Sequence, residues 1–198
     1  MNPSLEAAYI SAGSNRKVTY DDIYSFTIRG VDPNSNVNQL ITSGIRGIKS
    51  ILVVPMLSSS DNGGVSEFQS VQSSAGGGDV AMLHGLTNLN VQIGGVSQLS
   101  QNARYGYEMF NEQFAGVNSI NGGQSDGLTS GLISERSWSQ KHGYIYLQVN
   151  RGTELEKSSP KSVQLQFQSL NAKKMDYYVF ISYETSVNLD VGLGVLQM

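Results

Sequence analysis

Apolar and polar residues alternate along several short segments of the chain, which is the pattern of strands with one buried and one solvent-exposed face. The alternation is strict in Val163–Gln168 and clear in Leu86–Ile93 and Ser186–Val191. Gly94-Gly95 follows the second of these segments and leads into Val96–Leu99. Two glycines between two such segments predict a tight β-hairpin.

Segments dense in β-branched and aromatic residues are also predicted as strands: Val18–Ile28, Ile48–Val54, Tyr144–Val149 and Tyr177–Tyr183. Ile48–Val54 is almost continuously apolar, which predicts burial on both faces or nearly so. We expect Pro55 to stop this strand, because proline cannot donate to a strand ladder.

Helical periodicity is confined to short stretches. Apolar residues at i, i+3 and i+7 from Tyr107 predict a short amphipathic helix over Tyr105–Phe114, ended by Gly116. Gln39–Ile45 fits either a short helix or an extended turn, and Leu132–Trp138 fits a short helix.

Long connections separate these segments. Ser58–Gly78 and Asn118–Gly131 are rich in small and polar residues and predict long loops, the first with one short strand at Val65–Val71. Residues 1–16 are interpreted as an N-terminal arm or linker, and residues 17–198 as a single domain.

The predicted segments sum to seven to nine strands without alternation of strands and helices, which argues against a parallel α/β sheet. Strands with one wet face favour antiparallel pairing. We therefore predict an all-β fold, an antiparallel β-sandwich with one or two short helices in loops. A jelly roll of about eight strands is one of a few connectivities that this pattern allows.

Composition narrows the class of protein. Of the 198 residues, 39% are hydrophobic and 15% charged, which is too apolar and too evenly patterned for a disordered chain. The net charge of −3 lacks the basic excess that drives phosphate binding, so no direct nucleic-acid partner is expected. We find no cysteine, no signal-peptide pattern and no apolar run near the roughly 20 residues of a membrane span. A soluble chain that is intracellular at synthesis is therefore expected.

Side chains suited to catalysis are sparse. No Gly-x-Ser-x-Gly elbow accompanies His84 and His142, so both are interpreted as loop or strand-end residues and not as members of a hydrolytic triad. Four acids that could pair as in a glycosidase carry no sequence signature: Glu108, Glu112, Glu135 and Glu184.

Two kinds of segment imitate ligand-binding loops. Asp32–Val37 begins like a calcium loop, but Val37 stands where glycine is needed and Ser43 where glutamate is needed, so a turn is predicted. Gly76–Gly78 and Gly192–Gly194 lack the following Lys-Ser/Thr and helix of a phosphate loop. We therefore predict no catalytic, cofactor-binding or metal-binding residue.

The chain has 10 tyrosines, many of them in its second half: Tyr105, Tyr107, Tyr144, Tyr146, Tyr177, Tyr178 and Tyr183. Tyrosine combines a large apolar ring with a polar tip, which suits protein interfaces. It suits ordinary strands equally well, so both interpretations stand.

The order of several segments resembles one known family. They are Lys17–Tyr20, Gly47–Pro55, Leu86–Gly94, Tyr105–Phe110, Tyr144–Arg151, Tyr177–Glu184 and Val187–Val191. In this order they resemble the C-terminal jelly roll of the double-jelly-roll major capsid proteins of virophages, Polinton-like elements and adintoviruses. The last two segments are the most telling, because in this family a Tyr-Glu strand runs into an apolar-x-apolar-Asp-apolar tail and a glycine turn. The family's full protein has two jelly rolls, whereas this chain has room for one.

The resemblance implies a shell-forming subunit of the virion and not an enzyme. Such a subunit would assemble with other copies into trimeric, pseudo-hexagonal capsomers, with Ser58–Gly78 and Asn118–Gly131 at exposed or intersubunit surfaces. The alternatives are a single-jelly-roll minor capsid or penton protein, a receptor- or glycan-binding module, and a hydrolase on a sandwich.

Overall fold

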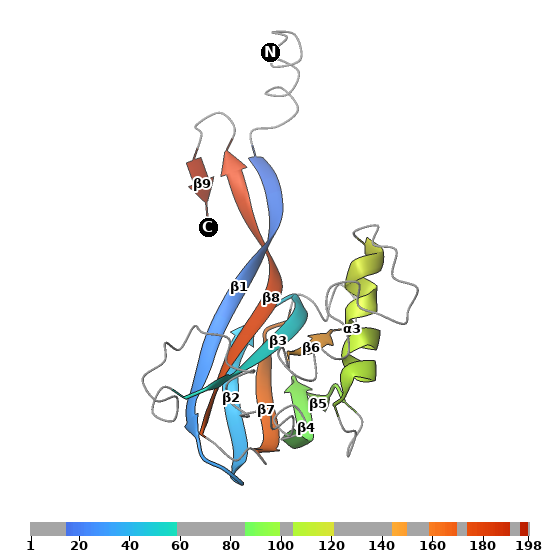
Figure 1. The fold of residues 1–198 in the computed structure, drawn as a ribbon. Coiled ribbons are helices and arrows are strands. Elements are labelled where there is room, and N and C mark those ends of the chain that lie inside the picture. The colour runs from blue at the N-terminus through green and yellow to red at the C-terminus, as the bar shows by residue number, and fades with distance from the viewer. Residues whose placement is uncertain are drawn as a thin grey trace.

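The computed structural model describes residues 15–58, 86–99, 105–120, 144–149, 159–169, 174–190 and 195–197. Within these ranges the strands are β1 (Asn15–Val31), β2 (Asn36–Ile45), β3 (Ile48–Leu57), β4 (Leu86–Ile93), β5 (Val96–Ser97), β6 (Ile145–Gln148), β7 (Lys161–Ser169), β8 (Met175–Asp190) and β9 (Val195–Gln197). One helix, α3 (Tyr107–Ile120), lies beside β6 (Figure 1).

The strands form two antiparallel sheets. One sheet has the order β1-β8-β3-β6, with β9 also paired to β8, and the other has the order β2-β7-β4-β5. The pairs β1–β8, β2–β7, β3–β6 and β4–β5 are those of one long hairpin whose tip lies between β4 and β5. The pairs β3–β8 and β4–β7 roll this hairpin into two sheets. This order is that of a jelly roll, so the predicted fold class is confirmed.

Alternating side chains close the space between the two sheets. Every second residue of β7 is buried: Val163, Leu165, Phe167 and Ser169. The predicted apolar face of β4 is buried too: Leu89, Val91 and Ile93. Buried residues of both sheets belong to one hydrophobic core, so the sandwich is held mainly by burial of apolar area.

The predicted hairpin at the tip of the roll is confirmed. Gly94 and Gly95 have φ angles of 59° and 80°. Positive φ at both central residues is what a two-residue type I′ turn requires, and glycine adopts it without steric cost. Ile93 therefore pairs with Val96 directly across the turn.

The prediction of a helix or turn at Gln39–Ile45 is wrong, because these residues belong to strand β2. Ile41 and Ile45 are buried, whereas Leu40 is 51% exposed. The spacing of Ile41 and Ile45 also fits a helix face, but pairing with β7 gives this segment a ladder of hydrogen bonds. Tertiary pairing thus overrides the local pattern.

The prediction that Pro55 stops its strand is also wrong, because β3 continues to Leu57. Val149 N–H donates to the Lys49 carbonyl, so the odd-numbered residues of β3 direct their backbone groups toward β6. β6 pairs only with Ser50–Val53, so at Pro55 the missing N–H interrupts no pairing between β3 and β6. The prediction of burial on both faces or nearly so is confirmed for this part of β3, because Ile51 and Val53 are buried and Leu52 and Val54 are half-buried.

The predicted helix is confirmed, but Gly116 does not end it, because α3 runs to Ile120. A glycine inside a helix costs about 1 kcal/mol relative to alanine, which weakens a helix without stopping it. Residues 118–120, predicted as loop, therefore belong to the helix. The predicted strand Val65–Val71 and helix Leu132–Trp138 lie outside the described residues.

β1 and β8 extend past the sandwich as a ribbon (Figure 1). β3 accompanies β8 only as far as the pair Ile48–Tyr183, whereas β1 follows β8 to the pair Asn15–Asp190. β9 adds a short third strand next to residues 188–190. We refer to residues 15–22 and 184–190 as the ribbon.

Candidate functional site

The acids considered for catalysis do not form a pair in the described part of the chain. Glu108 and Glu112 are exposed on α3, and Glu184, on the ribbon, binds Lys49 of β3. Glu135, His84 and His142 lie outside the described residues. Among the residues described, no group of three or more histidine, aspartate or glutamate side chains could hold a metal ion.

The segment that imitates a calcium loop is a turn between β1 and β2, as predicted. The Asp32 carboxylate lies 3.0 Å from the Lys174 ammonium, and Ser35 Oγ donates to the Asp32 carbonyl at 2.6 Å. Asn34 has a φ of 56°, a conformation that asparagine tolerates in turns. The turn thus directs its carboxylate to a lysine of the same chain. Gly76–Gly78 and Gly192–Gly194 lie outside the described residues.

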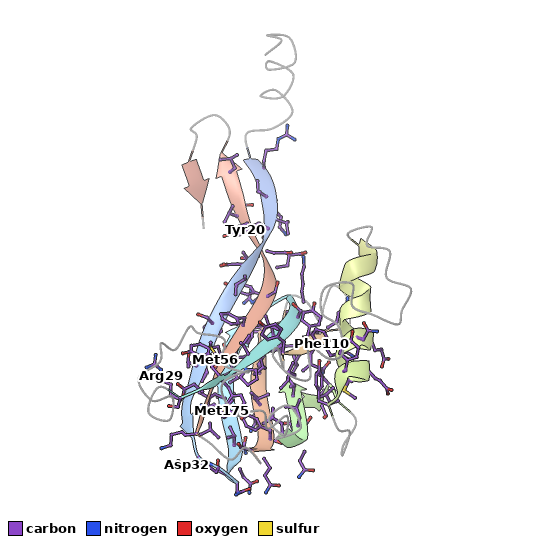
Figure 2. All side chains as sticks on the ribbon, in the orientation of Figure 1. Tyr20, Arg29, Asp32, Met56, Phe110 and Met175 are labelled. Carbon is purple, nitrogen blue, oxygen red and sulfur yellow. The ribbon has the colours of Figure 1, made fainter. Side chains whose placement is uncertain are left out.

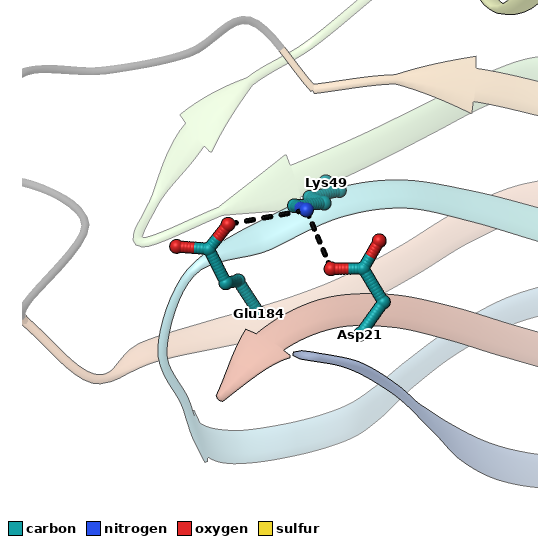
Figure 3. A network of polar contacts seen from close by, with 3 residues as sticks. All are labelled: Asp21, Lys49 and Glu184. Carbon is teal, nitrogen blue, oxygen red and sulfur yellow. Dashed lines mark hydrogen bonds and ion pairs between the residues drawn. The ribbon is translucent and has the colours of Figure 1, made fainter. Parts of the chain in front are cut away.

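A polar network joins three strands where the ribbon leaves the sandwich (Figure 3). Asp21 of β1 and Glu184 of β8 are direct cross-strand partners, which places two negative charges side by side. Lys49 of β3 lies between them, with its Nζ 2.5 Å from Asp21 Oδ1 and 3.1 Å from Glu184 Oε2. Like charges in direct opposition destabilise a sheet, and the lysine offsets this repulsion.

The electrostatics of Lys49 follow from these contacts. Its hydrogen bond to Asp21 is the main cause that raises the pKa of Lys49, burial opposes the shift, and the bond to Glu184 adds to it. All three side chains are well exposed, so the network is screened by solvent and contributes little to stability. Its evident effect is to fix β3 against the base of the ribbon.

The ribbon has one face that is partly apolar, because it also carries Arg16, Asp22 and Thr185, and one face that is polar. Register places Val18 opposite Val187, Tyr20 opposite Thr185 and Arg16 opposite Leu189 on the face that continues the core-facing side of the sheet. The other face carries polar pairs: Lys17–Asn188, Thr19–Ser186 and Asp21–Glu184. Val18 is 43% and Tyr20 44% exposed, and Figure 2 shows Tyr20 on the part of β1 beyond the sandwich. The core-facing pattern therefore continues where the second sheet no longer covers it.

The clustered tyrosines mainly serve the fold. Tyr177 is fully buried and Tyr105 is 4% exposed. Several of the others pack partly against the core: Tyr107, Tyr144, Tyr146 and Tyr183. The exposed Tyr20 lies outside the cluster that the sequence indicated. Its place on the ribbon follows from the register of β1 and β8, which the sequence pattern does not specify.

No family model matches the chain, and no curated protein matches it. Solved structures do. A chain of the PBCV-1 virus capsid matches with a TM-score of 0.53 and 8% identity, over 100% of this chain and 55% of that chain. A chain in the 3.5 Å structure of the Sputnik virophage matches with a TM-score of 0.48 and 11% identity, over 94% of this chain and 39% of that chain.

The likeness to the PBCV-1 capsid chain concerns the fold. The match to the PBCV-1 capsid chain extends over all of this chain and agrees with the jelly-roll order of the strands. The fold implied by the resemblance in sequence is therefore confirmed. This chain spans about half the length of that capsid chain, 55%, and 39% of the Sputnik chain. In the described part of the chain, no helix is long and apolar enough to cross a membrane.

Proposed function

We propose that the chain is a shell-forming structural subunit of a viral capsid. The observation that carries this proposal is the jelly roll itself, which matches a PBCV-1 capsid chain over 100% of the present chain with a TM-score of 0.53. One further feature supports it: apolar side chains of the sheet, Val18 and Tyr20, are left exposed on the ribbon. On this proposal residues 17–198 act as one jelly-roll domain in the virion, preceded by the arm 1–16.

The partner is a second copy of the same chain, and the ribbon is the surface through which it binds. A face carrying Val18, Tyr20 and Val187, backed by a fully polar face, favours burial of one side only. The net charge of −3 imposes only weak repulsion between copies, which suits repeated contacts in a shell. Burial through such symmetric contacts would drive assembly into trimeric capsomers. No nucleic-acid contact is part of this proposal.

The test compares two variants of the same strand by sedimentation velocity. Val18→Thr combined with Tyr20→Ser removes apolar area from the proposed contact face. Ile23→Thr removes it from the opposite face of β1, where Ile23 is 65% exposed. We expect the double variant to weaken self-association at least about tenfold, because each apolar side chain that is fully buried contributes about 1.5–3 kcal/mol. Ile23→Thr should sediment like the unmodified chain.

Equal sedimentation of the two variants and the unmodified chain would contradict the assignment of this surface. If the unmodified chain stays monomeric at every concentration, the shell-forming function itself is contradicted. A glycan-binding or receptor-binding module would be expected to behave in that way.

A further inference from the structure

Among the described strands, β6 forms one edge of the five-stranded sheet, so one side of its backbone faces away from the other described strands of that sheet. Val149 N–H donates to the Lys49 carbonyl at 2.9 Å, so the odd-numbered residues here direct their backbone groups toward β3. In an antiparallel strand the residues between them direct both groups the opposite way. The N–H and C=O of Tyr146, and the N–H of Gln148, therefore lie on the outer edge.

Two side chains bind these edge groups: Tyr105, just before α3, and Gln113, within α3. The Tyr105 hydroxyl accepts a hydrogen bond from Tyr146 N–H at 2.8 Å and donates one to Tyr146 C=O at 2.6 Å. Gln113 Oε1 accepts a hydrogen bond from Gln148 N–H at 3.0 Å. One phenol thus occupies both pairing groups of a strand residue, as a residue of a neighbouring strand would.

The position of this segment is set by burial. Tyr105 is 4% exposed and Phe110, one turn into α3, is 3% exposed, and both belong to the hydrophobic core. Burial raises the pKa of Tyr105, so its hydroxyl keeps the proton that it donates to Tyr146. The guarding side chains are therefore held in place by the core and not by the weak edge contacts alone.

We propose that Tyr105 and Gln113 form an edge guard that keeps an extended strand of a second copy from adding to β6. An open strand edge is a template for pairing with another chain, and natural sheets cover or interrupt such edges. In a protein present in many copies, an open edge would give disordered sheet-to-sheet association. The inference goes beyond the proposed function, since it concerns a contact that the guard prevents and not one that a shell needs.

Hydrogen exchange measured by NMR tests the two contacts separately. Tyr105→Phe keeps the ring but loses both bonds to Tyr146, and Gln113→Leu loses the acceptor for Gln148. We expect the amide of Tyr146 to exchange roughly tenfold faster in the first variant, and the amide of Gln148 likewise in the second, as the loss of a hydrogen bond predicts. Gln113→Glu keeps an acceptor and should restore protection of Gln148. Tyr183→Phe removes a hydroxyl that donates to Asp22 and is the matched control.

The guard's effect on association is measured by thioflavin fluorescence, which reports stacked strands and not an ordered shell. The combined variant Tyr105→Phe/Gln113→Leu should form fluorescent, β-rich aggregates under conditions in which the unmodified chain and Tyr183→Phe form none. The proposal is overturned if the combined variant aggregates no more than the control. It is equally overturned if faster exchange extends to Ile181 in the central strand β8, because the side chains would then only stabilise the fold. If the unmodified chain is monomeric, the capsid function is contradicted, but the aggregation of the combined variant still tests the edge guard.

Discussion

The ring of Phe167 in β7 meets the ring of Tyr177 in β8 across the sandwich, with centroids 4.7 Å apart and planes tilted by 58°. The two residues belong to different sheets and are 4% and 0% exposed. A tilted aromatic pair at this separation contributes about 0.5–1.5 kcal/mol beyond the burial of its area. The pair therefore ties the two layers of the jelly roll together within the core.

Truncation of this contact should destabilise the whole fold. Phe167→Ala is expected to lower the free energy of unfolding by about 3–5 kcal/mol, because it removes buried ring atoms and leaves a cavity. Leu40→Ala, in the neighbouring strand β2 of the same sheet, is the control, since Leu40 is 51% exposed and should cost no more than about 0.5 kcal/mol. Urea unfolding followed by circular dichroism measures both, and similar losses would contradict the assigned core.

Substitutions at two glycines distinguish the cost of a positive φ from the cost of steric crowding. Gly95 has a φ of 80° and open space around the position of a Cβ, so Gly95→Ala should cost about 1–2 kcal/mol from conformation alone. Gly47 has a φ of 62°, and a Cβ there would lie 2.9 Å from the Glu184 carbonyl oxygen. Gly47→Ala should therefore lose distinctly more stability in the same urea experiment. Equal losses for the two variants would show that β8 does not approach Gly47 this closely.

The Lys49 network predicts a dependence on alkaline pH. The hydrogen bond to Asp21 raises the folded-state pKa of Lys49 above its ordinary value of 10.5. The protonated lysine therefore stabilises the folded chain below pH 10.5, and this contribution is lost as pH rises through the raised pKa. For an exposed network the contribution is about 1 kcal/mol or less.

Urea midpoints of the unmodified chain and Lys49→Met measure this contribution at about pH 8 and about pH 11. The unmodified chain should have the higher urea midpoint at the lower pH. Its advantage over Lys49→Met should be smaller at the higher pH. Lys17→Met is the control for the general loss of one positive charge. Lys17 lies on the same face of β1 as Asp21, but nearer the end of the ribbon. A difference that persists or grows at high pH would contradict the network.

Features set by local chemistry could be predicted from the sequence. The alternation of Val163–Gln168 and the glycines at Gly94-Gly95 specify a half-buried strand and a type I′ turn without reference to the rest of the chain. The predictions were wrong where pairing with a strand distant in sequence determines the local structure. Gln39–Ile45 is a strand because β7 pairs with it, and Pro55 is tolerated because its missing N–H points where β6 does not pair.

The candidate surfaces depend on register and could not be predicted. The apolar face of the ribbon exists because Val18 lies opposite Val187, which requires the alignment of segments from the two ends of the described chain. The edge guard joins Tyr105 to Tyr146 across 41 positions, and nothing around either tyrosine indicates the other. The sequence pattern indicated that tyrosines were abundant, but only the fold separates core residues from the exposed Tyr20.

The mass of the chain in solution tests the central claim most directly. Sedimentation equilibrium over a wide range of concentrations gives this mass without reference to any particular contact. A shell-forming subunit should reach at least three times the 21.4 kDa mass of one chain as concentration rises, and return to a single chain on dilution. A mass that stays at 21.4 kDa at every concentration would contradict the account.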